Sequence, residues 1–233
     1  MNKRINTNPH CFISVVGPAG SGKTRLIGRM IFNQEKIFKP TFDRILYFYK
    51  HYQEPYGNIK TACLSKNVDI EFIQGLEWDA VEHSEALKKR TLVVVDDLYE
   101  DAAQSKEFLD LVIAGRHRNI HLMVLRHNLF QQSKNSKTID LNVTQIVLFH
   151  SPRDLEQIGI LGRQLGERST LMKAYKRATQ EAFGHLMIDL DVRSSRSLRY
   201  SSRCSGNAPS QFHFTTDQLF ISLNDEFTKL LYS

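Results

Sequence analysis

One glycine-rich stretch near the N-terminus has the residue types and the spacing that bind phosphate. Glycines let backbone N–H groups curl around a phosphate, and the positive end of a following helix adds to the attraction. In such a loop the lysine neutralises the β- and γ-phosphates of a nucleotide, and the last hydroxyl is offered to Mg²⁺. At ordinary residue usage a chance match has a probability of roughly 1%. The stretch fits the Walker A pattern G-x-x-x-x-G-K-[ST] and reads Gly17-Pro18-Ala19-Gly20-Ser21-Gly22-Lys23-Thr24.

Two flanking elements must position this stretch. Residues 11–16 form a short, mostly apolar run of β-forming residues, which predicts a buried strand. Residues 25–37 place apolar side chains at helical spacing, which predicts a helix. A strand, a glycine-rich turn and a helix in that order make the pattern a phosphate-binding loop, so we expect Lys23 and Thr24 to contact a nucleotide.

A second apolar run ends in two acids. Residues 91–95 are rich in β-branched side chains and lead directly into Asp96 and Asp97. A central parallel strand delivers carboxylates to the same edge of a sheet as the phosphate loop. We therefore expect Asp96 to hold Mg²⁺, directly or through water, and Asp97 to orient or polarise the attacking water. Many hydrolases of this type carry glutamate at the second position, and the alternative is a buried strand that enters an acidic turn.

A further strand is predicted at residues 120–125, followed by Arg126, His127 and Asn128. In the large class of P-loop ATPases with an added strand, this strand lies between the two Walker strands and places a polar residue beside the γ-phosphate. His127 or Asn128 is then the sensor of that phosphate. Ordinary loop polarity is the alternative explanation.

The whole chain fits a nucleotide-binding α/β protein. Its 233 residues, 41% apolar content and 24% charge are typical of a globular domain, and the net charge of +6 mildly favours an anionic partner. No apolar run reaches membrane-spanning length, and three cysteines without CxxC spacing favour a reducing interior, so we expect a soluble, intracellular protein. The expected fold is a P-loop NTPase of ASCE/RecA-like type, with a central, mostly parallel five-stranded sheet flanked by helices. We expect a flexible lead over residues 1–10, an ATPase domain over 11–191 and a basic Ser/Arg-rich tail over 192–233.

Weaker signals concern the connecting segments. Residues 50–64 carry Pro55 and Gly57 and are expected to form an irregular surface segment. Ser151 suits the N-cap of a helix that would have Pro152 in its first turn. The remaining elements are expected as strands over 44–49, 68–73, 145–149 and 184–190, and as helices over 78–89, 105–116 and 169–179.

Several stretches occurring together in this order resemble one family. Besides the two Walker motifs, these stretches are residues 115–120, 127–132, 136–142, 146–154 and 162–165. They resemble the genome-packaging ATPases of the FtsK–HerA superfamily, above all the branch found in Maverick/Polinton elements, adintoviruses and virophages. Poxvirus packaging ATPases are more distant kin. The resemblance covers about residues 10–191, and its Asn-Leu-Phe and Ser-Pro-Arg-Asp segments are more specific than either Walker motif.

The resemblance implies ATP and Mg²⁺ as ligands and double-stranded DNA, bound without regard to sequence, as the partner. Such motors work as homo-oligomeric rings in which a subunit inserts an arginine into its neighbour's site. They act with a capsid or portal component at the site of virion assembly. The family usually has glutamine where His127 stands. The candidates for the inserted arginine are Arg118, which we favour, and Arg116 and Arg163.

The sequence therefore predicts an ATP-driven DNA translocase that packages a viral or virus-like genome into a capsid. The segment from Gln131 to Lys137, with Lys134, is a candidate for the DNA-gripping loop of the pore, or it is merely a solvated loop. A small-molecule P-loop kinase is the alternative, and it would use Arg163 and Arg168 in a lid. A degenerate ATP-binding, DNA-associated protein without hydrolysis is the third reading.

Overall fold

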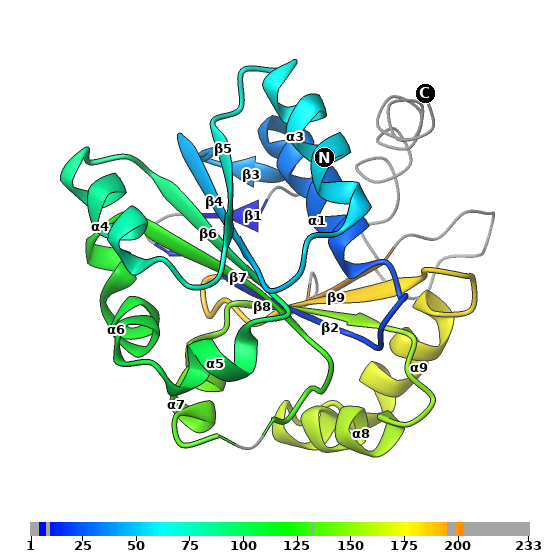
Figure 1. The fold of residues 1–233 in the computed structure, drawn as a ribbon. Coiled ribbons are helices and arrows are strands. Elements are labelled where there is room, and N and C mark those ends of the chain that lie inside the picture. The colour runs from blue at the N-terminus through cyan, green and yellow to red at the C-terminus, as the bar shows by residue number, and fades with distance from the viewer. Residues whose placement is uncertain (1–4, 8–9, 132, 195–198, 203–233) are drawn as a thin grey trace.

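The computed structural model of the chain describes residues 5–7, 10–131, 133–194 and 199–202 (Figure 1). Strands and helices alternate along most of this length, which is the pattern of a parallel sheet with crossover helices. The elements are β1 (Ile5–Asn6), β2 (Phe12–Val16), α1 (Lys23–Phe32), α2 (Gln34–Ile37), β3 (Phe38–Lys39), β4 (Arg44–Tyr49), α3 (Glu54–Leu64), β5 (Ile70–Gln74), α4 (Trp78–Ala86), β6 (Thr91–Asp96), α5 (Tyr99–Gln104), α6 (Lys106–Ala114), the 3₁₀ helix η1 (Gly115–His117), β7 (Ile120–Arg126), α7 (Ser136–Asn142), β8 (Gln145–Phe149), α8 (Leu155–Gln164), α9 (Arg168–Ala178), β9 (His185–Asp189) and β10 (Tyr200–Ser202).

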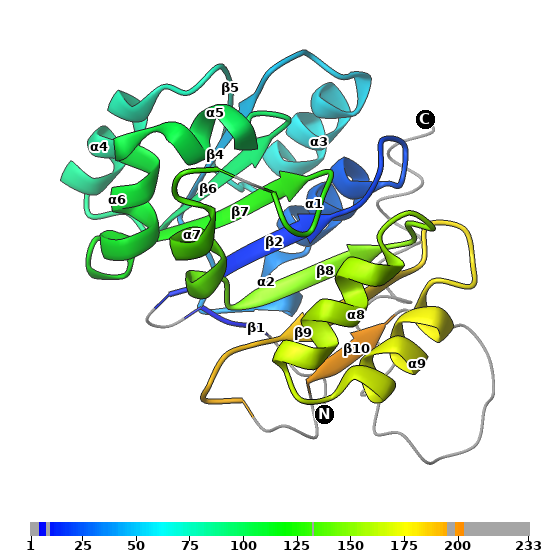
Figure 2. The same cartoon turned by 90° about the horizontal axis from the view of Figure 1, so that it is seen from below.

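The described residues form an eight-stranded sheet with the order β10-β9-β8-β2-β7-β6-β4-β5 (Figure 2). The strands from β8 to β5 are parallel, whereas β9 runs antiparallel to β8 and β10 antiparallel to β9. The α/β class and the mostly parallel sheet are confirmed, and so is the position of β7 between the two Walker strands. The expected count of five strands in this sheet was too low. The strands predicted over 68–73 and 184–190 also pair into it as β5 and β9, and β10, which was not predicted, extends the edge beyond β9.

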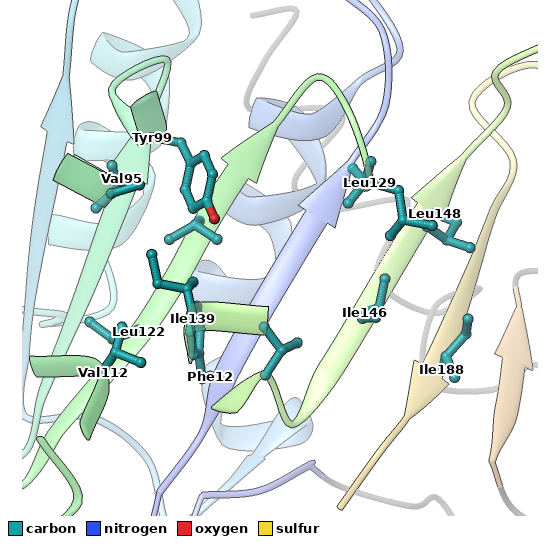
Figure 3. Close-up of a cluster of buried hydrophobic side chains, with 14 of the residues drawn as sticks. Phe12, Val95, Tyr99, Val112, Leu122, Leu129, Ile139, Ile146, Leu148 and Ile188 are labelled. Carbon is teal, nitrogen blue, oxygen red and sulfur yellow. The ribbon is translucent and has the colours of Figure 1, made fainter. Parts of the chain in front are cut away.

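Two apolar cores hold the sheet between its helices. Successive residues of β2 point to opposite faces of the sheet. Phe12 and Val16 pack with α4 to α9, whereas Ile13 and Val15 pack with α1 to α3. This alternation follows from the two-residue period of a strand, and a strand buried on both faces is apolar throughout. Figure 3 shows Phe12, Leu122 and Ile146 from three neighbouring strands on the first of these faces. Within the described residues no helix combines the length and the apolar character needed to cross a membrane.

The segment that was expected to be irregular forms α3. Its proline, Pro55, occupies the first turn of the helix, where the missing N–H breaks no helical hydrogen bond. Tyr56, Ile59 and Cys63 lie on its buried side and join the core that contains α1. The prediction failed because it treated the proline as a breaker rather than as a helix start.

The start of α8 also differs from the prediction. The helix begins at Leu155 with Asp154 at its N-cap, so Ser151 is not the cap. Instead the Ser151 hydroxyl lies 2.5 Å from Oδ2 of Asp154 and closes a turn before the helix. The proline therefore belongs to that turn and not to the helix.

Both ends of the chain depart from the expected boundaries. Within the expected loose lead, Ile5–Asn6 pairs in parallel with β3, and Thr7 is buried. Within the expected tail, Tyr200 pairs with Ile188 and so places β10 at the edge of the sheet. Those two parts of the expectation were wrong. The rest of the predicted tail, over 203–233, lies outside the described residues.

A buried histidine, His121, and a half-buried one, His10, pack together at the end of the sheet where β7 begins. The rings of His10 and His121 stack with centroids 5.9 Å apart. The Nδ1–H of His10 donates to the Ile120 carbonyl at 3.1 Å, and Nδ1 of His121 accepts the backbone N–H of Cys11 at 3.2 Å. Burial lowers the pKa of His10 to about 4 and that of His121 to about 3, with help from the nearby charge of Arg90 on His121. Both rings are therefore neutral at pH 7.

The buried pair makes stability dependent on pH in a defined direction. An unfolded histidine has a pKa of about 6.5, so below that pH the unfolded chain binds protons that the folded chain does not. We expect the free energy of unfolding to be unaffected by this pair above pH ~6.5 and to fall steadily as the pH drops toward about 4. Urea denaturation at a series of pH values measures this slope.

The matched variants are His121→Gln, which keeps an acceptor for the Cys11 N–H, and His83→Gln, which changes an exposed histidine on α4. The first should flatten the slope and the second should leave it unchanged. Identical slopes in the parent and in both variants would contradict the assignment of the pH dependence to the buried rings.

Candidate nucleotide-binding site

The glycine-rich stretch forms a loop between the end of β2 and the start of α1. The Gly17 N–H donates to the Arg126 carbonyl at 3.1 Å, which fastens the first turn of the loop to β7. Gly20 and Gly22 have φ angles of 74° and 97°, in the left-handed region that favours glycine. A β-carbon on Gly17 would lie 2.7 Å from Cβ of Phe149, so the loop could not pass β8 with a larger residue there.

Lys23 is folded back over the loop. Its ammonium donates to the carbonyls of Gly17 at 2.7 Å and Pro18 at 3.0 Å, and the side chain is buried. Burial lowers the pKa of Lys23, while the neighbouring charges of Asp97 and Asp96 oppose this shift. The positive charge is thus fixed at the mouth of the loop, as the motif predicted.

Asp96 is a buried carboxylate surrounded by hydroxyl groups. Its Oδ2 accepts hydrogen bonds from Tyr47 at 2.7 Å, Tyr56 at 2.9 Å and Thr24 at 3.1 Å. Burial raises the pKa of Asp96, and the hydroxyl hydrogen bonds, led by that of Tyr47, oppose the rise. The structure thus brings Thr24 and Asp96 into contact, and the sequence had assigned both to the same metal ion. The two tyrosines were missed, because one was counted only as part of a strand and the other lay in the supposed irregular segment.

Asp97 lies between two polar side chains. Its Oδ2 accepts a hydrogen bond from Nε2 of Gln53 at 3.2 Å, and its Oδ1 lies 3.4 Å from Nε2 of His127. Its φ of 56° is left-handed, so the backbone turns sharply directly after β6. The structure thus brings the second acid and one sensor candidate together. Asn128 is exposed and is not part of the cavity wall.

Arg126 fixes the end of β7, a role that was not predicted from the sequence. Its buried guanidinium donates to Ser14 Oγ at 2.9 Å, to the Tyr99 hydroxyl at 3.2 Å and to Asp140 at 2.6 Å. These partners come from β2, α5 and α7. The carboxyl ends of β2 and β7, and therefore the phosphate loop and His127, are held in register.

These side chains surround a cavity of about 510 Å³, within the size range of ligand sites. Its lining includes both acids and His127, which lie at the ends of β6 and β7, and also Phe183, which comes just before β9. A smaller cavity of about 180 Å³ adjoins the other side of the loop and also contacts Phe183. The larger cavity is lined by Ala19, Gly20, Ser21, Gly22, Lys23, Thr24, Arg25, Gln53, Pro55, Asp96, Asp97, His127 and Phe183.

The arginine candidates lie away from this cavity. Arg118 comes just before β7, at the amino-terminal ends of the parallel strands, whereas the loop lies at their carboxyl ends. It contacts Glu85 at 2.6 Å and Asp110 at 2.5 Å. The hydrogen bond with Glu85 is the main cause that raises the pKa of Arg118. Arg116 and Arg163 are exposed, the first after α6 and the second in the last turn of α8. The guanidinium that was favoured from the sequence is thus the one engaged by carboxylates of its own chain.

The two lysine candidates lie near the start of α7. Lys134 and Lys137 are both exposed. They follow the carboxyl end of β7, and α7 covers the face of the sheet that carries Phe12. The structure places both charges in solvent.

Comparison with known proteins adds a family and a set of similar folds. The family described as Poxvirus A32 protein matches residues 3–188. Curated proteins give no match. The genome packaging NTPase B204 of Sulfolobus turreted icosahedral virus 2, in complex with ATP-gammaS, has a TM-score of 0.55 and 16% identity, with coverage of 80% of this chain and 96% of that chain.

Further solved structures have the same fold. The B204 NTPase of the same virus in complex with AMPPCP has a TM-score of 0.55 and 15% identity, again covering 80% of this chain and 96% of that chain. B204 of Sulfolobus turreted icosahedral virus, described as a DNA-packaging ATPase, has a TM-score of 0.52 and 13% identity and covers 83% and 96%. At these identities the likeness shows that the fold is shared.

The tyrosine hydroxyls around Asp96 can be tested by their effect on stability. Tyr56→Phe removes one hydrogen bond to a buried carboxylate, so we expect the free energy of unfolding to fall by about 1–3 kcal/mol. Tyr52→Phe is the matched control, because Tyr52 is 66% exposed. Urea denaturation measures both variants. Equal stability of the two variants would show that the hydroxyl of Tyr56 does not support Asp96.

Proposed function

The chain belongs to the poxvirus A32 protein family, and on that premise we propose that it is an ATP-hydrolysing motor that packages double-stranded DNA into a viral or virus-like capsid. One observation carries the proposal: Lys23, Thr24 and Asp96 meet Asp97 and His127 around a single cavity at the carboxyl edge of the sheet. The shared fold of the B204 packaging NTPases supports the same reading.

ATP binds with its phosphates in the glycine-rich loop. The N–H groups at the start of α1 and the Lys23 ammonium attract the β- and γ-phosphates. Thr24 and Asp96 would hold Mg²⁺, since hydroxyl and carboxylate oxygens suit that ion and their side chains are already in contact at 3.1 Å. When bound, Mg²⁺ neutralises charge on the phosphate oxygens.

Asp97 is the group that accepts a proton from the attacking water. Its carboxylate faces the cavity and is oriented through both oxygens by Gln53 and His127. His127, following β7, also reaches the region of the γ-phosphate and can donate a hydrogen bond there. The pair therefore couples the state of the phosphate to the position of the carboxylate that acts as the catalytic base.

The motor works as a ring of identical subunits in which an arginine enters the neighbouring site. An arginine supplied in this way raises hydrolysis about 10³–10⁵-fold in other nucleotidases. Arg116 and Arg163 are the better candidates because both are exposed, whereas Arg118 would first have to leave Glu85 and Asp110. A finger at any of these positions must come from the neighbour, since none lines the cavity of its own chain.

DNA is gripped through its phosphates without base reading, and Lys134 and Lys137 supply charge to the pore. Their segment directly follows β7 and His127, so a shift at the γ-phosphate has a short path to the DNA. The remaining partner is a capsid or portal component, and the site of action is where virions assemble.

The first test is steady-state ATP hydrolysis with and without double-stranded DNA. We expect turnover that DNA stimulates and that rises steeply with protein concentration, because the site is completed by a neighbouring subunit. Lys23→Ala should abolish it, since the loop then lacks its cation. Mixing in subunits with Arg116→Ala, Arg163→Ala or Arg118→Ala identifies the finger as the variant that lowers turnover of the mixed rings.

Other outcomes would point to other functions. Phosphorylation of a nucleoside by a monomer, without DNA stimulation, would favour a small-molecule kinase. Tight ATP binding without turnover would identify a degenerate protein, and restoration by His127→Gln would locate the defect at the sensor position.

The DNA contact is tested by salt dependence. Replacing Lys134 and Lys137 with alanine should weaken DNA binding and reduce the slope of log K against log salt by roughly 2, if each lysine neutralises one phosphate. Fluorescence anisotropy with a duplex at several salt concentrations measures the slope. The control pair is Lys36→Ala with Lys39→Ala, on α2 and β3, which pack on the other face of the sheet. An unchanged slope in the first pair would remove these lysines from the pore.

A further inference from the structure

Phe183 has no explanation in the packing of the protein. Its side chain is 61% exposed, although Gly184 and His185, which directly follow it, are buried. Its φ of 61° is left-handed, a conformation that bulky side chains rarely adopt. Such backbone strain gathers at ligand sites, where the surrounding structure over-determines it. We therefore expect a function of the Phe183 ring other than packing in the core.

The ring lies against the phosphate loop. A β-carbon on Gly22 would be 3.2 Å from Cδ1 of Phe183, so only a glycine at that position allows this approach without a shift. Phe183 lines both the large cavity and the smaller one, which share Ala19, Gly20 and Ser21. The phenyl ring is thus a wall of the nucleotide site itself.

The segment that presents the ring is a tight turn. The Gly184 N–H donates to the Glu181 carbonyl at 3.0 Å, and a β-carbon on Gly184 would lie 2.5 Å from the Ala178 carbonyl oxygen. The following residue, His185, packs its ring against Phe149 with centroids 5.1 Å apart. These contacts hold the backbone of the turn that carries Phe183, so the backbone needs little ordering when a ligand binds.

The order of the strands gives the direction of a bound nucleotide. Asp96 ends β6 and His127 follows β7, on one side of β2, whereas Phe183 precedes β9, on the other side. The phosphate loop follows β2, and Figure 2 shows β8 and β9 on the side of β2 away from β7. If Asp96 and His127 lie at the γ-phosphate end, the nucleoside end of a bound nucleotide would point toward β8 and β9, the side on which Phe183 lies.

We propose that Phe183 is the platform on which the base of the bound nucleoside triphosphate stacks. The inference rests on the proposed function, because it takes the glycine-rich loop as the site of the phosphates. Stacking on a phenyl ring tolerates different bases, since every base has a π-face. The contact therefore adds affinity for a nucleoside over a bare polyphosphate and selects little between adenine and guanine.

The test compares two ligands that share their phosphates. Isothermal titration in Mg²⁺ measures the Kd of ATP and of inorganic tripolyphosphate for the full chain and for Phe183→Ala. We expect the variant to bind ATP roughly 5- to 100-fold more weakly and tripolyphosphate as well as the parent does. Phe183→Tyr should keep the affinity for ATP. Leu141→Ala, which removes another exposed apolar side chain, should change neither affinity.

Two results would overturn the inference alone. One is an equal loss of affinity for both ligands in Phe183→Ala, which would mean that the ring only shapes the loop. The other is unchanged ATP binding in that variant. If the parent protein binds neither ligand and Lys23→Ala makes no difference, the proposed function fails as well, so the two failures are distinguishable.

A spectroscopic variant keeps the test open if Phe183→Ala does not fold. Phe183→Trp places a second indole in the chain. The one native tryptophan, Trp78, packs against Phe48 and Phe108 on the face of the sheet that carries Phe12. Stacking of a base should quench the new fluorescence on addition of ATP, and tripolyphosphate should not. Equal quenching by both ligands, or none by either while both bind, would contradict the stacking contact.

Discussion

The buried carboxylate of Asp96 is the constraint on which the arrangement of the site depends. At 1% exposure a carboxylate must be supplied with hydrogen bonds, or its desolvation would oppose folding. The donors are Thr24, Tyr47 and Tyr56, which come from α1, β4 and α3. One charge therefore ties the helix of the phosphate loop, the neighbouring strand and a crossover helix to the end of β6.

Arg126 plays the corresponding part on the other face of the sheet. Its guanidinium joins β2, α5 and α7, while its backbone carbonyl holds Gly17. The strands β2, β7 and β6 are thus fixed at their carboxyl ends from both faces. Asp97 and His127 project beyond this framework, with side chains 37% and 56% exposed. The side chains of Asp97 and His127, which we propose act on the attacking water and the γ-phosphate, are therefore freer to move than Asp96 and Arg126, which hold the strands beneath them.

The sequence predicted what depends on local pattern and missed what depends on distant contacts. The loop, the acids and the strand between them follow from residue types and periodicity, and the parallel sheet follows from their order. Tyr47 was read only as a strand residue and Arg126 only as a polar residue after a strand, because their partners Asp96 and Ser14 lie 49 and 112 positions away. The α3 helix was not predicted, because Pro55 was taken as a helix breaker, whereas a proline in the first turn does not disturb a helix.

Asp97 and His127 lie beside each other in the lining of the cavity. An aspartate has less reach than a glutamate, so its own side chain alone would fix the position of the carboxylate poorly. In the structure Gln53 contacts one of its oxygens and His127 lies beside the other. A histidine ring nitrogen can donate a hydrogen bond to a carboxylate or to a phosphate. The orientation of this carboxylate therefore depends on residues from two other segments of the chain, and a change at either of them would be felt at Asp97.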